Sequence, residues 1–126
     1  MKAKVLIADD EKMIADTLAL ILNQGGFDAR AVYTCRKALD IALSFRPDIL
    51  VSDVLMDMNG VDAAVQLRAL LPDLRVFLLS GQTATADILT DAKAQDLRFE
   101  VLVKPVHPQE LLRKLHDAAL GMRSVA

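Results

Sequence analysis

The segment VLIADDE, residues 5–11, decides the fold. Four consecutive apolar residues lead into three acidic ones, which is typical of a strand that is buried on both faces and ends at a polar edge. Two other short runs, residues 49–51 and 76–79, are also continuously apolar. Strands covered on both faces occur in parallel sheets that carry a helical layer on each side. These runs therefore predict an α/β protein.

Two weaker runs complete a set of five expected strands. Residues 29–32 alternate between apolar and polar side chains, which favours an edge of the sheet, and residues 99–103 form the last strand. Apolar residues recur at helical spacing in five intervening segments, which are residues 14–22, 38–45, 61–71, 83–93 and 108–119. This alternation of strand and helix requires right-handed crossovers and predicts a parallel sheet with helices on both faces.

Turn and cap residues mark the ends of these helices. Gly25-Gly26 is expected to end the first helix, and Thr34 is expected to be the N-cap of the second. Pro72-Asp73 is expected to end the third helix. The tail, residues 121–126, is expected to fray because it is short and begins with glycine.

Length and composition narrow the class of protein. The 126 residues fit a single domain spanning 1–126, with no output domain in this chain. Fifteen basic residues against seventeen acidic ones leave no positive excess for phosphates, so we expect no nucleic-acid binding. The single cysteine, Cys35, excludes an intrachain disulfide.

No apolar run approaches the ~18 residues of a membrane span, and no signal peptide is evident. A cytoplasmic protein without membrane contact is therefore expected.

Polar residues follow the strands at one edge of the expected sheet. Asp9 and Asp10 follow the first strand, Asp53 the third, Ser80 the fourth and Lys104 the fifth. Ligands bind beyond the carboxyl ends of the strands in such sheets. Three crowded carboxylates repel one another, and an ammonium or a divalent cation would relieve them. An all-oxygen site suits Mg²⁺, with Mn²⁺ a possible substitute, and a carboxylate beside the metal can attack a phosphoryl group.

In this order, each at a strand end, these residues resemble a response-regulator receiver domain of two-component signalling. The resemblance covers residues 4–120. It implies a flavodoxin-like, five-stranded doubly wound sheet with strand order 2-1-3-4-5, in which five strand–helix units follow one another. It also implies a signalling protein rather than an enzyme, one that catalyses only its own phosphoryl transfer and dephosphorylation.

The resemblance implies a magnesium site and its ligands. Asp10 would bind Mg²⁺ directly, together with Asp53 and the backbone carbonyl of Leu55. Asp9 would act on the ion mostly through water.

The resemblance implies roles in phosphoryl transfer for three side chains. Asp53 would be the phosphoacceptor, and Ser80 would be the switch hydroxyl that moves to bind the phosphoryl group. Lys104 would pair with that group, and the bond between Lys104 and Pro105 would be cis.

The same resemblance implies the partners. A sensor histidine kinase or a histidine phosphotransfer protein would donate the phosphoryl group to Asp53. The phosphorylated chain would act on a downstream protein partner or on an output domain missing from this chain.

Several positions depart from the family pattern. Asp57 stands where the family usually has proline, and Val101 stands where it has an aromatic switch residue. Phe99 lies two residues before Val101, on the same side of the strand by alternation. In the family, the residue at the position of Leu55 tunes hydrolysis of the phosphoryl bond. The apolar Leu55 cannot position the water that attacks this bond, so we expect slow loss of the phosphoryl group.

Three alternatives remain beside this interpretation. Asp57 and Val101 motivate an interaction module that works without phosphorylation. An enzyme of the haloacid-dehalogenase type would need an acid two residues after Asp53, where Leu55 stands. A flavin-binding protein would need a loop that attracts phosphate after the first strand, and the acidic loop there would repel it.

Overall fold

The computed structural model describes residues 2–54, 56, 60–81 and 99–124. Its strands form one parallel sheet in the order β2-β1-β3-β4-β5. The strands are β1 (Lys4–Ala8), β2 (Asp28–Val32), β3 (Ile49–Asp53), β4 (Arg75–Ser80) and β5 (Glu100–Val103). Both the strand order and the edge position of β2 are confirmed.

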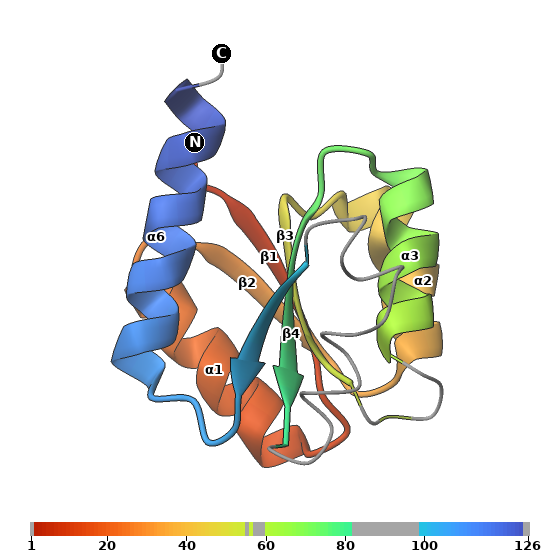
Figure 1. The fold of residues 1–126 in the computed structure, drawn as a ribbon, viewed down its shortest axis with the longest axis horizontal. Helices are drawn as coiled ribbons and strands as arrows, with labels where there is room; N and C mark the ends of the chain where they lie inside the picture. The colour runs from red at the N-terminus through yellow and green to blue at the C-terminus, as the bar shows by residue number, and fades with distance from the viewer. Residues whose placement is uncertain (1, 55, 57–59, 82–98, 125–126) are drawn as a thin grey trace.

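Helices cover both faces of the sheet (Figure 1). The helices α1 (Lys12–Gln24) and α6 (Pro108–Ser124) pack on one face. The helices α2 (Cys35–Phe45) and α3 (Gly60–Leu70) pack on the other face. The helix expected over 83–93 lies outside the described residues. This layered arrangement leaves the carboxyl ends of the strands at one edge of the molecule.

Alternation along the central strands divides the core into two layers. In β1, Val5 and Ile7 face α1 and α6, whereas Leu6 faces α2 and α3. All three side chains are fully buried, because helices cover both faces of the sheet over this central strand. The continuous apolar run in the sequence is therefore explained by burial on both faces.

The expected signals mark one boundary of each of three helices. Gly25 follows α1, and Gly26 has a φ of 100°, a left-handed conformation that favours glycine. The Thr34 hydroxyl accepts the Lys37 N–H at 3.0 Å, as an N-cap does. The helix α3 ends at Leu70, two residues before Pro72.

The expectation that the C-terminal tail frays is wrong for residues 121–124, and residues 125–126 lie outside the described part of the chain. The helix α6 continues through Gly121 to Ser124. Glycine inside a helix costs about 1 kcal/mol relative to alanine, which does not end a helix already held by its earlier turns. Leu111, Leu115 and Ala118 bury that earlier part against the sheet.

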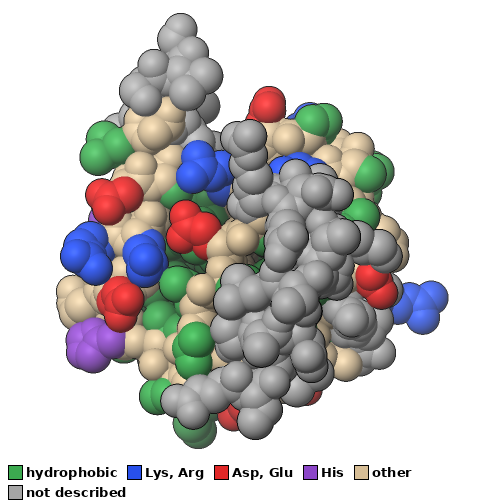
Figure 2. Space-filling view, in the orientation of Figure 1, with side chains coloured by type: hydrophobic (Ala, Val, Ile, Leu, Met, Phe, Trp, Pro, Cys, Tyr) green, Lys and Arg blue, Asp and Glu red, His purple; other side chains and the backbone are tan. Residues whose placement is uncertain are grey.

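The exposed face of α6 carries charges of both signs. Figure 2 shows acidic and basic side chains interspersed over this helix. Glu110, Arg113 and Asp117 are among its exposed residues.

Among the described helices, none combines the length and apolarity that a membrane-spanning segment needs.

Candidate functional site

The end of β1 places Asp9 and Asp10 in different surroundings. The Asp9 N–H continues the pairing with β2 by donating to the Val32 carbonyl at 3.1 Å. The Asp9 carboxylate then accepts the Glu11 N–H at 2.9 Å, and its side chain is fully buried. Asp10, the next residue, is exposed. The turn therefore presents one carboxylate inside the site and one at its surface.

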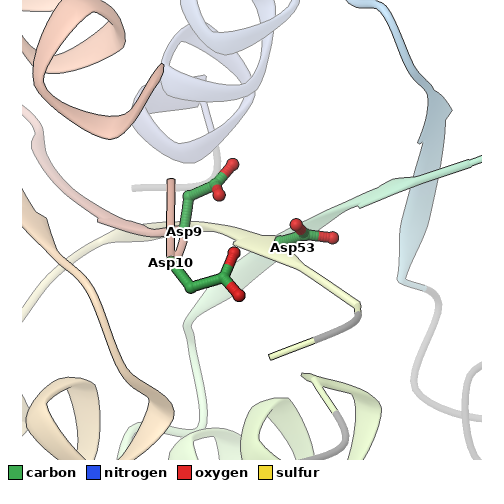
Figure 3. A group of neighbouring side chains, drawn as sticks. All are labelled: Asp9, Asp10 and Asp53. Atoms are coloured by element: carbon green, nitrogen blue, oxygen red, sulfur yellow. The ribbon is translucent and has the colours of Figure 1, made fainter. Parts of the chain in front are cut away.

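Asp53 comes to the same place from the neighbouring strand. It is the last residue of β3, which pairs with β1 so that Ala8 lies opposite Ser52. The Asp53 side chain is largely buried. One carboxylate oxygen from each of Asp9, Asp10 and Asp53 lies within 4.8 Å of the others (Figure 3). The structure thus brings together the three acids that the sequence placed at strand ends.

A close approach by α3 borders the end of β3. The Gly60 N–H donates to the Val54 carbonyl at 2.9 Å. A Cβ at Gly60 would collide with the Asp53 carbonyl oxygen and would lie 2.9 Å from the Val54 Cα. Only glycine therefore allows α3 to begin this close to the strand. The sequence pattern shows a glycine here but gives no sign of this contact.

Lys104 supplies a positive charge to the acidic cluster. Its Nζ lies 2.7 Å from Asp53 Oδ2 and 3.8 Å from Asp9 Oδ2. Its backbone N–H donates to the Ser80 carbonyl at 2.7 Å, which extends the pairing of β5 with β4. The bond between Lys104 and Pro105 is cis, as expected.

Burial and charge shift the pKa values of Asp9 and Lys104. Burial raises the pKa of Asp9, and the charges of Asp53 and Asp10 add to this shift. The hydrogen bond from Glu11 and the charge of Lys104 oppose the rise without cancelling it. Burial by itself lowers the pKa of Lys104, but its hydrogen bond to Asp53 and the nearby acids raise that pKa overall.

The Ser80 hydroxyl lies at the end of β4, where the sequence placed it. It is buried and donates to the Gly81 carbonyl at 2.9 Å. Leu55 and Asp57 lie outside the described residues.

Sulfur and hydroxyl groups gather around Met56, three residues after Asp53. The buried Ser52 hydroxyl donates to the Asp53 carbonyl at 3.0 Å and lies 3.9 Å from Met56 Sδ. Cys35 Sγ, buried at the start of α2, lies 3.8 Å from the same sulfur. The sequence indicated the position of Cys35 but not its contact with Met56, because that contact joins segments 21 residues apart.

Val101 of β5 and Phe99, the residue just before β5, lie on one side of the chain, as alternation predicts. Both side chains pack in the part of the core that lies between the sheet and the helices α2 and α3. Phe99 is buried, and the Arg68 guanidinium lies 5.2 Å from the centre of its ring. The aromatic side chain is therefore held in the core at the beginning of the strand, remote from the Lys104 end.

A hollow of about 670 Å³ opens beside the acidic cluster. Ile14 and Leu18 of α1 form one wall, and Pro105 and Val106 form another. Lys104 also lines it, whereas the three aspartates do not. The ion pair thus borders a largely apolar surface.

The residues present fit a divalent cation. Asp9 Oδ2 is buried and accepts no hydrogen bond from any described residue. Three carboxylates share the site with the ammonium group of Lys104. A hard cation with oxygen ligands, such as Mg²⁺, would offset the remaining negative charge.

Comparison with known proteins agrees with this geometry. The sequence profile of the response regulator receiver domain matches residues 5–116. The DNA-binding response regulator MtrA of Mycolicibacterium paratuberculosis is 29% identical, over 100% of this chain and 58% of its own length. The response regulator MprA of Mycolicibacterium vanbaalenii is 30% identical, over 91% of this chain and 49% of its own length.

Solved structures show the same fold. A CheY-like receiver domain protein from Methanospirillum hungatei superposes with a TM-score of 0.89 at 20% identity, over all of both chains. The chemotaxis response regulator CheY4 of Vibrio cholerae superposes with a TM-score of 0.79 at 27% identity, over 93% of this chain and 98% of its own. The chain belongs to the response-regulator receiver family, whose domains are signalling modules of two-component systems. It spans about half the length of the relatives MtrA and MprA.

Proposed function

We propose that Asp53 accepts a phosphoryl group from a phosphohistidine, carried by a sensor histidine kinase or a histidine phosphotransfer protein. The observation that carries the proposal is the contact of Asp53 Oδ2 with Lys104 Nζ at 2.7 Å, inside a cluster of three carboxylates. A carboxylate held beside a fixed ammonium group and a metal site has the surroundings of a phosphoryl acceptor.

The transfer exchanges one bond for another. An oxygen of the Asp53 carboxylate attacks the phosphorus, a P–O bond forms, and the P–N bond to the donor imidazole breaks. The released imidazole nitrogen keeps the electron pair and takes up a proton. Lys104 then pairs with the phosphoryl oxygens instead of with the free carboxylate.

The proposed metal ligands are the carboxylates of Asp10 and Asp53 and the backbone carbonyl of Leu55, with Asp9 acting through water. Mg²⁺ is the proposed ion, and Mn²⁺ fits the same oxygen ligands. When bound, the ion supplies positive charge to the transferring phosphoryl oxygens. The buried Asp9 oxygen that accepts no hydrogen bond from a described residue supports this assignment.

The proposed output is a change in protein contacts. Phosphorylation adds about −1.5 to −2 charges at Asp53, and the Ser80 hydroxyl at the end of β4 would turn to bind the new group. The partner is a downstream protein or an output domain joined to this chain. MtrA is described as DNA-binding and is longer than this chain, which supports the second arrangement.

Phosphorylation by acetyl phosphate tests the proposal directly. Intact mass should show a gain of one phosphoryl group in wild type with Mg²⁺ and none with EDTA. Asp53→Asn should abolish the gain, whereas the matched control Asp40→Asn, an exposed residue of α2, should keep it. No gain in wild type would refute the proposal and favour a module that binds its partner without phosphorylation.

Slow dephosphorylation is a second part of the proposal. A polar side chain at position 55 would hold an attacking water, which leucine cannot do. Leu55→Asn should therefore speed the loss of the phosphoryl mass severalfold, followed over time after removal of acetyl phosphate. An unchanged rate would contradict this role.

A further inference from the structure

A contact between α1 and the residue after β2 lies next to the acidic cluster. The Tyr33 hydroxyl donates to Asp16 Oδ1 at 2.6 Å. The Lys12 Nζ lies 4.9 Å from the centre of the Tyr33 ring, in a cation–π arrangement. Lys12 and Asp16 are one turn apart on α1, so both contacts join the same face of that helix to one ring.

The position of Lys12 in the sequence is electrostatically unusual. It is the first residue of α1, where the helix dipole disfavours a cation. It also follows the exposed carboxylate of Asp10 by two residues, and a long flexible ammonium side chain is attracted to such a group. An ammonium on Asp10 would compete with a divalent cation for that carboxylate. In the described part of the chain, however, Lys12 makes no ion pair with Asp10 and lies over Tyr33 instead.

The backbone holds Tyr33 in the place that this contact requires. The preceding residue, Val32, accepts the Asp9 N–H at 3.1 Å, so Tyr33 follows directly from the edge of the site. The ring is partly buried against the core beneath α1 and α6. The hydrogen bond from the Tyr33 hydroxyl to Asp16 holds the other end of the side chain.

We infer that Tyr33 is a positioning residue, which holds the Lys12 ammonium on its ring and keeps the Asp10 carboxylate available to a divalent cation. This inference rests on the metal site in the proposed function. Tyr33 itself contacts neither the metal nor the phosphoryl group. The gain is in metal affinity, because a captured Lys12 does not have to be displaced when the ion binds.

Binding of Mn²⁺, followed by the electron paramagnetic resonance signal of the free ion, tests this role. Tyr33→Leu keeps apolar packing but removes the aromatic face and the hydroxyl, and Tyr33→Phe keeps the face alone. We expect Tyr33→Leu to weaken Mn²⁺ binding about two- to fivefold, the range that one exposed charge pair supplies. Tyr33→Phe should stay within about twofold of wild type, because the cation–π contact remains.

Lys12→Met identifies the cause of any loss. In the Tyr33→Leu background it should restore wild-type affinity, because the competing ammonium is gone. Alone, it should change the affinity by less than about twofold, since Lys12 already lies away from Asp10. This single variant leaves the ring intact, so it tests the inference even if Tyr33→Leu does not fold.

The outcomes separate this inference from the metal site on which it rests. If wild type binds no Mn²⁺, or Asp10→Asn binds it equally well, the proposed metal site is wrong. If wild type binds and Asp10→Asn does not, the site stands. Equal affinity of Tyr33→Leu and wild type would then overturn the role of Tyr33. A loss that Lys12→Met does not restore, or a large gain from Lys12→Met alone, would overturn it as well.

Discussion

Asp9, a proposed metal-site residue, carries a buried charge that opposes the stability of the fold. Its carboxylate is fully buried beside two other acids, and burial raises its pKa. Glu11 and Lys104 offset only part of that effect. A group of this kind persists where its charge is needed for binding, and here the charge suits a metal ion.

Asp9→Asn should stabilise the metal-free protein near neutral pH. The pKa of Asp9 is raised above its ordinary 3.8, so the folded chain binds more protons than the unfolded chain between these two values. The stability that Asp9 contributes is therefore fully present below pH 3.8 and is lost as the pH rises through the folded-state pKa. Asparagine avoids this loss and still accepts the Glu11 N–H.

Thermal unfolding in EDTA checks the prediction. The melting temperature of Asp9→Asn should match wild type near pH 3.5 and should exceed it increasingly towards pH 7. Asp40→Asn, an exposed matched control, should follow wild type throughout. A lower melting temperature for Asp9→Asn at neutral pH would show that the carboxylate is stabilising.

At the scale of elements, Asn23 joins the end of α1 to the edge strand β2. Its side-chain amide donates to the Ala29 carbonyl at 3.1 Å and accepts the Ala29 N–H at 2.8 Å. The side chain thus satisfies backbone groups on a strand that has one neighbour in the sheet. The helical pattern of the sequence does not reveal these two hydrogen bonds, because they form only when the chain turns back after Gly26 and brings Ala29 next to Asn23.

Asn23→Ala should lower the free energy of unfolding by about 1–3 kcal/mol, because it leaves both Ala29 groups without their partner. Urea denaturation measures the change. The neighbouring exposed Gln24, changed to alanine, is the matched control and should stay within about 0.5 kcal/mol of wild type. Equal effects of the two substitutions would show that the two hydrogen bonds contribute nothing measurable.

Gly60→Ala should destabilise the protein although alanine favours helices. A Cβ there meets backbone atoms of Asp53 and Val54, which cannot rotate away. We expect a loss of about 1–3 kcal/mol in urea denaturation. We also expect slower phosphorylation by acetyl phosphate, because Asp53 must move.

Gly121→Ala provides the control for that prediction. Among the described residues, the nearest atom to a Cβ at Gly121 is Arg75 Nη1 at 4.0 Å, so these residues leave room for alanine. This substitution in α6 should raise stability by up to about 1 kcal/mol. If Gly60→Ala behaved in the same way, the close contact at the end of β3 would have no energetic consequence.

At the scale of the whole molecule, the site joins three strands through charge as well as hydrogen bonds. Asp9 follows β1, Asp53 ends β3 and Lys104 follows β5. A ligand that holds the carboxylates together therefore stabilises the packing of the sheet ends, not one loop alone. Binding to the folded state alone must raise the stability of that state.

Mg²⁺ should raise the melting temperature of the wild-type chain in a concentration-dependent way. At a hundred times its dissociation constant, the ion adds about 2.7 kcal/mol to the free energy of unfolding. Asp10→Asn should remove most of this response, whereas Asp40→Asn should keep it. A wild-type melting temperature that is the same in Mg²⁺ and in EDTA would contradict a metal site at the acidic cluster.

The sequence by itself determined the class of fold and the convergence of the acidic side chains at one edge of the sheet. Apolar runs such as residues 5–8 and 49–51 reflect burial on both faces, which is a property of each segment alone. Because parallel strands end at one edge, Asp9, Asp10, Asp53 and Lys104 had to converge there. Thr34 and Gly25-Gly26 likewise act within a few residues of their own position.

Only the tertiary structure decided the contacts between segments that are distant in the chain. The Gly60 approach, the Met56 sulfur contacts and the Lys12–Tyr33 pair depend on atomic distances after packing. The continuation of α6 past Gly121 also departs from local propensity. The chemistry of a side chain determines which groups it can bind, but the packing of the whole chain determines which of those groups lie close enough to contact it.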